Sequence, residues 1–328
     1  MTQPTDGTRP RQHPATRPAK AVATLAAGAA VLALAGCGGP VSGSANTPAN
    51  TPASPPAPAN LAFVDTQATT DAAAGVKKAV ETVFSYDSTQ PAAVAQHEQQ
   101  YLTGAARSAF DQTFAQVKAT PVQTQTTVLD SGVLELTPTS AKVLTIAGQQ
   151  STAQNGQKNS ATAIMLLTAT SAGGHWQLSQ IEVSPKAAAE PASGPAGTPA
   201  GTRDAVLTAA HKAAAILLTV NAKNADAVFD SYESVAADPL LSQFRDTRAH
   251  TVDGMKQSGA DASLDPQSVA ALTSLSADGT KAEVLLGGLV NTQQQGGEQQ
   301  RQIPAKLTMV KQGPAWKVSG ITTVTPGS

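Results

Sequence analysis

The sequence predicts an α+β fold that occurs twice along the chain, and three observations lead to this prediction. In residues 61–186, apolar side chains recur first with the helical period of about 3.6 residues and then with the strand period of about two. Residues 203–328 repeat that order. Between them, residues 187–202 are rich in alanine, proline, glycine and serine, which is typical of a linker. Helices followed by strands indicate α+β domains rather than a parallel nucleotide-binding sheet.

Three helices are predicted at the start of the first domain. Asn60 is a candidate N-cap for the first helix, whose apolar face comprises Val76, Val80, Val83 and Phe84. Pro91 suits the first turn of a second helix, which Gly104 ends. The apolar stripe of the third helix comprises Ala106, Phe110, Phe114 and Val117.

Four strands are predicted after these helices, because β-branched and aliphatic residues become frequent there. Their ranges are Thr126–Leu136, Ala141–Ala147, Ala161–Thr170 and Trp176–Val183. Asn155-Gly156 and Gly173-Gly174 are turn signals between them. The domain therefore ends in an antiparallel sheet.

The second domain follows the same plan. Its first helix has an apolar stripe of Val206, Ala210, Ala214 and Leu217. Asn224 is a candidate cap for the second helix, and Asp238-Pro239 opens the third. The predicted strands are Ser268–Ser276, Lys281–Leu289, Gln302–Val310 and Trp316–Val324.

Short segments of the two halves also match each other. Phe110–Thr113 precedes Phe244–Thr247 by 134 positions, and Ala141–Leu144 precedes Ala282–Leu285 by 141. The segments that begin with Trp176 and Trp316 lie 140 positions apart, and each tryptophan is interpreted as a core anchor of its copy. Offsets that stay nearly constant in the same order indicate a duplicated domain.

Residues 1–36 are interpreted as a lipoprotein signal peptide. Four basic residues precede an apolar run at 21–35, which is shorter than the roughly 20 residues of a spanning helix. Leu34, Ala35, Gly36 and Cys37 resemble a bacterial lipobox, in which the cysteine is diacylated and becomes the mature N-terminus. Two acyl chains hold a protein stably at a membrane. We therefore expect Cys37 to anchor the protein at the extracytoplasmic face of the cell membrane.

Residues 37–60 are interpreted as a disordered tether, because they contain too few apolar residues to offset the cost of ordering. The chain has a single cysteine, so no intrachain disulfide is expected. Loss of residues 1–36, whose net charge is +3, changes the net charge from −1 to −4. No basic run occurs, which argues against nucleic acid as a partner.

Tyr86 and Asp87 are the candidate pocket residues. An aspartate with a raised pKa can act as a base, and a tyrosine can stabilise an oxyanion. The alternative is that Asp87 ends a helix and starts a turn while Tyr86 packs on the sheet, and the sequence favours this alternative. The histidines show no ligand spacing, so neither a metal nor another cofactor is expected.

Several short segments are similar to one known family. They are Phe63–Asp65, Val83–Asp87, Leu102–Gly104 with Phe110, Val143-Leu144 and Gly174–Leu178. Together they resemble the Mce-associated membrane proteins of actinobacteria, over about residues 61–184 and more weakly 203–325. The resemblance implies nuclear-transport-factor-like cone domains, each with helices packed on a curved antiparallel sheet. It also implies an accessory role for Mce transporters, which carry lipids or sterols across the envelope.

The chain departs from this family because a lipobox replaces the transmembrane helix and because it has two domains. The second copy also has Val220-Asn221 in place of Tyr86-Asp87. We therefore expect a non-catalytic, lipid-anchored scaffold or adaptor with an envelope or transport protein as partner. Two alternatives stay open. One is a module that binds an apolar ligand, such as a lipid, in the cone pocket; the other is an isomerase-like or dehydratase-like enzyme that uses Tyr86 and Asp87.

Overall fold

A computed structural model describes residues 58–117, 121–186, 194–294 and 297–326. All of these residues belong to one compact unit, Pro55–Ser328. The predicted signal peptide, nearly all of the predicted tether and part of the predicted linker lie outside the described residues. The described part combines helices with an antiparallel sheet, as the sequence predicts.

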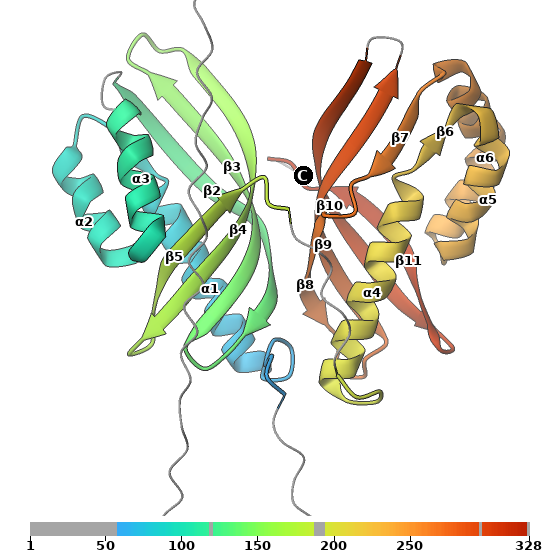
Figure 1. Ribbon diagram of the computed structural model, residues 1–328, viewed down its shortest axis with the longest axis horizontal. Coiled ribbons are helices and arrows are strands. Elements are labelled where there is room, and N and C mark those ends of the chain that lie inside the picture. The colour runs from blue at the N-terminus through green and yellow to red at the C-terminus, as the bar shows by residue number, and fades with distance from the viewer. Residues whose placement is uncertain (1–57, 118–120, 187–193, 295–296, 327–328) are drawn as a thin grey trace, which may run out of the picture. The chain divides into compact units, whose positions relative to one another are not determined.

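The first half places helices on one face of its strands (Figure 1). Its helices are α1 (Thr66–Val83), α2 (Pro91–Tyr101) and α3 (Gly104–Val117). Its strands are β1 (Tyr86–Asp87), β2 (Val122–Leu136), β3 (Ser140–Ala153), β4 (Lys158–Ala172) and β5 (His175–Val183).

The second half has a similar element order. Its helices are α4 (Pro199–Leu217), the short 3-10 helix η1 (Ala222–Asn224), α5 (Ala225–Val235) and α6 (Leu240–Ser258). Its strands are β6 (Val220-Asn221), β7 (Asp261–Leu264), β8 (Val269–Leu275), β9 (Lys281–Gln294), β10 (Gly297–Gln312) and β11 (Ala315–Thr323).

Helix α1 begins later than predicted. Its N-cap is Asp65, whose carboxylate accepts a hydrogen bond from the backbone N–H of Ala68. Asn60 is therefore not the cap. Instead its side chain joins the entering chain to β2, because it accepts from the N–H of Leu136 and donates to the carbonyl of Leu134.

Helix α4 begins at Pro199, so the last four residues of the predicted linker are helical. The side chain of Thr198 accepts from the N–H of Gly201, and Pro199 occupies the first turn, where its missing N–H costs nothing. In α5, the predicted cap Asn224 makes no side-chain cap bond. Asn221 caps η1 instead, since it accepts from the N–H of Asn224.

The strands are longer than predicted at their polar ends. Thr152 pairs with both Gln123 and Lys158, so the β3–β4 hairpin extends well beyond the apolar stretch. The sequence also did not indicate β7, which pairs with β9, or the two-residue strands β1 and β6. These short strands have no apolar alternation, and only their pairing partners define them.

The main strands follow the order β11-β10-β9-β8-β2-β3-β4-β5, so the sheets of both halves are continuous through β8 and β2. The joining residue pair is Val133 and Leu272. Gly132 permits this approach, because a Cβ there would lie 2.7 Å from the carbonyl oxygen of Leu272.

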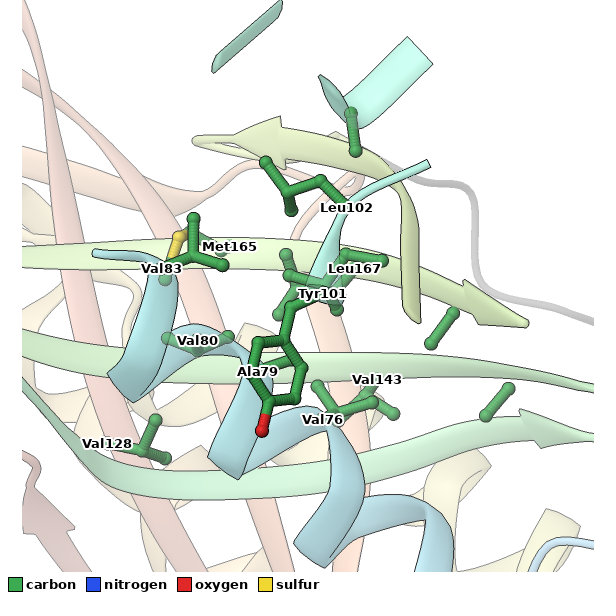
Figure 2. Close-up of a cluster of buried hydrophobic side chains, with 14 of the residues drawn as sticks. Val76, Ala79, Val80, Val83, Tyr101, Leu102, Val128, Val143, Met165 and Leu167 are labelled. Carbon is green, nitrogen blue, oxygen red and sulfur yellow. The ribbon is translucent and has the colours of Figure 1, made fainter. Parts of the chain in front are cut away.

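The two faces of each sheet bury different residues. In β3, Val143 faces the helices of the first half, and Figure 2 shows it near Val76 of α1. The next residue, Leu144, faces the other way and packs with Val269 and Leu285 of the second half. The middle of β3 is therefore buried on both faces, by the helices of the first half and by the sheet of the second half.

A backbone bridge covers an edge strand in each half. Leu102, between α2 and α3, forms a parallel bridge with Leu178 of β5. Ala236, between α5 and α6, forms the corresponding bridge with Val318 of β11. These bridges satisfy backbone groups that an open sheet edge would leave free for pairing with other chains.

Candidate functional site

Tyr86 and Asp87 form β1, the short strand between α1 and α2. They pair with Thr124 and Gln123 of β2, which fixes both residues at the edge of the sheet. The two residues line a pocket of about 380 Å³ together with Ser85, Gln123, Thr124, Gln125, Gln150 and Thr152. Most of this lining is hydroxyl or amide, so the pocket offers neutral hydrogen-bonding groups and one carboxylate.

The carboxylate of Asp87 is engaged in a turn. Its Oδ1 accepts hydrogen bonds from the hydroxyl of Thr89 at 2.6 Å and from the backbone N–H of Thr89 at 2.9 Å. These bonds, the side-chain one first, lower the pKa of Asp87 below its ordinary value. A general base near neutral pH needs a raised pKa. The geometry therefore matches the turn-starting role of Asp87 and gives no support to its use as a base.

The ring of Tyr86 packs inward, beside the helices. It meets Phe114 of α3 edge to face, with 5.4 Å between ring centroids. Phe114 stacks on Phe110, which in turn meets Phe84 at 5.9 Å. These four rings belong to the apolar core of the first half.

The second half has a related turn with different residues. Val220 and Asn221 form β6, which pairs with β7 as β1 pairs with β2. The side-chain oxygen of Asn221 accepts from the backbone N–H of Asn224, three residues on, whereas Asp87 accepts from the backbone N–H of Thr89, two residues on. At both positions the side-chain oxygen accepts a hydrogen bond from a backbone N–H of the following turn, and in the second half an amide does so without an acidic group.

A second pocket lies alongside α1, where the helix meets the turns of the sheet, and has a volume of about 590 Å³. We call it the α1 groove. Its polar lining includes Asp65, Asp71 and Lys78 of α1, and its aromatic lining includes Tyr101, His175 and Trp176. The sequence did not indicate this groove, because its residues come from α1, from the end of α2 and from two strand turns.

The other predicted residues fall into two groups. Trp176 and Trp316 are half-buried, and each packs against the core of its own half, as predicted. Leu34, Ala35, Gly36 and Cys37 lie outside the described residues, so their assignment as a lipobox stays a prediction.

Across the described ranges, no group of three or more His, Cys, Asp or Glu is placed to hold a metal ion. No helix in that same part of the chain has the length and apolar character that a bilayer crossing requires.

Side chains also make contacts between the two halves that the sequence did not indicate. Arg203 of α4 is 2% exposed, and its guanidinium donates to the carbonyls of Asn60 and Ala62 at 3.0 and 2.9 Å. Lys306 of β10 forms an ion pair of 2.6 Å with Asp130 of β2. These contacts join segments far apart in the sequence, so local patterns could not reveal them.

Comparisons with known proteins give matches only among solved structures, all at low TM-scores. No family model matches the chain, and no curated protein matches it. Among solved structures, an NTF2-like protein involved in plasmid conjugation has a TM-score of 0.26 and 10% identity, over 77% of this chain and 96% of its own. A periplasmic fragment of TraM has a TM-score of 0.29 and 10% identity, over 35% and 95%. The intermembrane-space region of the chloroplast protein ARC6 has a TM-score of 0.28 and 12% identity, over 36% and 95%. At these TM-scores none of the three assigns a function to this chain.

Proposed function

We propose that this protein is a non-catalytic, lipid-anchored adaptor at the extracytoplasmic face of the cell membrane, serving a transport complex of the Mce type. The observation that supports this most concerns what packs on the two faces of each half's sheet. Leu144 and Ile164 of the first half are buried against Val269 and Leu285 of the second. The two sheets thus shield each other's apolar faces, and the helices of each half lie on the opposite face of its sheet. This arrangement suits a platform that contacts partners through its helices.

We further propose that the halves are two copies of one nuclear-transport-factor-like cone domain. Corresponding elements support this, because the bridge of Leu102 to Leu178 recurs as Ala236 to Val318. The matched segments also fall on equivalent elements: Phe110 and Phe244 lie on α3 and α6.

The turn at Asp87 supports a non-catalytic role. An aspartate that acts as a general base near neutral pH needs a raised pKa, whereas hydrogen bonds from Thr89 lower the pKa of Asp87. Asn221 fills the same position in the second half without an acidic group. The aromatic side chains beside Tyr86 also reduce the space for an apolar ligand.

Membrane fractionation and partner capture test the proposal. We expect the wild-type chain in the membrane fraction and a Cys37→Ala variant in the soluble fraction, because the variant has no acylation site. Crosslinking in intact cells, followed by affinity purification of the wild type, should recover an envelope transport protein. A Cys37→Ala variant that stays fully membrane-bound would contradict the anchor. Repeated recovery of the protein without any envelope or transport protein would contradict the adaptor role.

A further inference from the structure

Strand β4 extends past the end of β5, its neighbour at the edge of the sheet (Figure 1). β3 pairs with residues 158–170 of β4, whereas β5 pairs only with residues 165–172. The last bond in the line of β5 comes from the N–H of Ser184, which donates to the carbonyl of Ile164 at 3.0 Å. Residues 158–163 therefore have a neighbouring strand on one side only, and we call them the β4 edge.

The outer side of the β4 edge presents backbone groups without a partner strand. Successive residues of an antiparallel strand direct their N–H and C=O groups to opposite sides. The carbonyl of Ile164 faces the line of β5, and β4 pairs with β3 without a register shift, so Ser160 and Thr162 face that side too. Residues 158–162 are all exposed. Two N–H and two C=O groups thus lie in a row that a further strand could use.

The turn at Ser184 ends β5 and leaves this edge open. Ser184 has a φ of 55°, a left-handed conformation that residues other than glycine seldom adopt. Pro185 follows, and it has no N–H with which to continue the ladder. The side-chain amide of Gln302 on β10 donates to the hydroxyl of Ser184, and Lys186 forms an ion pair of 3.3 Å with Asp265. These contacts with the second half fix the exit of the chain from β5.

An exposed apolar side chain lies where the β4 edge begins. Val183 is 64% exposed, and no other large hydrophobic side chain among the described residues is exposed. Val183 pairs with Met165, so it points to the helix-facing side of the sheet. Ala161 and Ala163 lie on that same side by the alternation of the strand. An apolar strip therefore runs beside the row of outward backbone groups.

The second half has an equivalent edge on β10. The N–H of Val324 donates to the carbonyl of Pro304, just as that of Ser184 donates to Ile164, and corresponding residues are 140 positions apart. β11 pairs with β10 only beyond this point, so residues 297–304 also lack a strand on their outer side.

This second edge differs in the side chains that it carries. At the offset of 140 positions, Arg301 corresponds to Ala161, and Thr323 corresponds to Val183. A charged side chain on an edge strand discourages pairing with other chains. Residues 159–163 of β4 include no charged residue and no proline. The fold therefore tolerates a protected edge at this place, and the apolar character of the β4 edge is not a structural requirement.

We propose that the β4 edge binds an extended segment of a partner protein, which adds a strand to the sheet in the line of β5. The backbone of the segment bonds to the outward groups of Ser160 and Thr162. Its apolar, β-branched side chains lie over Ala161 and Ala163, beside Val183. This surface is additional to the helices, and its use by the adaptor is the only part that rests on the proposed function.

Fluorescence anisotropy of a labelled peptide tests this inference on the full-length acylated protein in detergent micelles. The probe is the end-blocked peptide Thr-Val-Thr-Val-Thr with a methyl group on the backbone nitrogen of each valine. Its threonine N–H groups lie along one side and can pair with β4, while the methylated side prevents growth of a larger sheet. The control probe is methylated on every backbone nitrogen. We expect saturable binding of the first probe and at least tenfold weaker binding of the second.

Matched variants locate the binding. Ser160→Pro removes an outward N–H that the fold does not use, so the variant should fold and bind the probe at least tenfold more weakly. Glu298→Pro makes the same change at an exposed, outward position of the β10 edge and should leave binding unchanged. Ala161→Arg with Val183→Thr gives the β4 edge the residues of the second half and should also weaken binding at least tenfold. Thermal unfolding checks that each variant folds.

The inference is overturned if the first probe does not saturate at millimolar concentration, if the fully methylated probe binds equally well, or if Ser160→Pro and Glu298→Pro behave alike. Sedimentation velocity without probe adds a further test. A dimer that Ser160→Pro dissociates would make a second copy of the chain the occupant and would likewise overturn the inference. Loss of membrane attachment or of the envelope partner would refute the adaptor role and leave the peptide result standing.

Discussion

Arg203 of α4 donates a hydrogen bond of 2.9 Å to the backbone carbonyl of Ala62, 141 residues earlier in the chain. The second half thereby holds the segment with which the first half begins. The same segment is held from the other side, because the N–H of Phe63 donates to the hydroxyl of Thr69 on α1. The ring of Phe63 packs against the cores of both halves. The point where the predicted tether meets the fold is thus fixed by both halves together.

Replacement of Arg203 should destabilise the whole fold. An Arg203→Met variant removes the donor to the carbonyls of Asn60 and Ala62 and the 2.7 Å ion pair with Asp204. We expect the free energy of unfolding to fall by about 3 kcal/mol, because buried polar groups that lose their partners are costly. Guanidinium chloride unfolding measures this. Arg301→Met on the exposed surface of β10 is the control, and equal effects of the two substitutions would refute the role of Arg203.

Glycines at the junction of the sheets should not tolerate side chains. A Cβ at Gly287 of β9 would lie 2.8 Å from Cγ2 of Ile164 on β4. Gly287→Ala should therefore lower stability by about 1–3 kcal/mol, as overpacking does. Gly254 of α6 has open space around it, so Gly254→Ala should raise stability by about 0.5–1 kcal/mol through helix propensity. Thermal unfolding of both variants decides the matter; a neutral or stabilising Gly287→Ala would show that the sheets do not meet there.

Tyr232 should make the fold sensitive to alkaline pH. Burial raises its pKa to about 12, and its hydroxyl donates to the carbonyl of Thr219. An unfolded tyrosine loses its proton near pH 10, so between pH 10 and about 12 the unfolded state binds fewer protons than the folded state. The stabilisation by Tyr232 is complete below pH 10 and is lost as the pH rises through that window. The stability difference between wild type and Tyr232→Phe should therefore shrink over the window, and a constant difference would contradict the assignment.

Asp87 should tolerate replacement by asparagine, the residue that the second half has at the equivalent position, Asn221. Asp87→Asn keeps an acceptor for the N–H of Thr89 and should change stability little, whereas Asp87→Ala should destabilise. Because the pKa of Asp87 is lowered on folding, its stabilisation is present above the unfolded pKa and is lost as the pH falls through the folded pKa. Carboxyl NMR titration should place that pKa below 3.8. An Asp87→Asn variant as unstable as Asp87→Ala would show that the charge itself is required.

Local patterns predicted those parts of the fold in which one face is buried. Val76 and Val80 recur with the helical period, and both are fully buried beneath α1. The polar end of β3 was missed because Gln150 and Ser151 have no apolar alternation, although their backbone still pairs with β2 and β4. β7 was missed for a similar reason, since it forms only where β9 provides a partner.

The candidate site shows the same limit. The turn at Tyr86-Asp87 could be predicted, because the helical pattern ends there and Pro91 follows. The α1 groove could not be predicted, because Asp71 and Trp176 are far apart in the sequence and meet only through the packing of α1 on β5. The ion pair of Lys306 with Asp130 could not be predicted for the same reason, because the two residues are far apart in the sequence.

The continuous apolar run of β4 leads to a last prediction. Ile164 and Leu166 pack against the second half, while Met165 and Leu167 between them pack under the helices of the first half. A strand buried on both faces has no alternating polar residues, and the sequence indeed shows none at these positions.

A chain that comprises only residues 58–186 would expose Ile164 and Leu166 together with Leu144 and Ile146. We expect this fragment to self-associate through that face, because exposed apolar patches of this kind drive association. Sedimentation velocity at micromolar concentration should show dimers or larger species for the fragment and a monomer for the full-length protein without its anchor. Ile164→Lys in the fragment should reduce the association, whereas Lys158→Ala at the exposed end of the same strand should not. A fragment that is folded and monomeric would show that the first half does not need the second to cover its sheet.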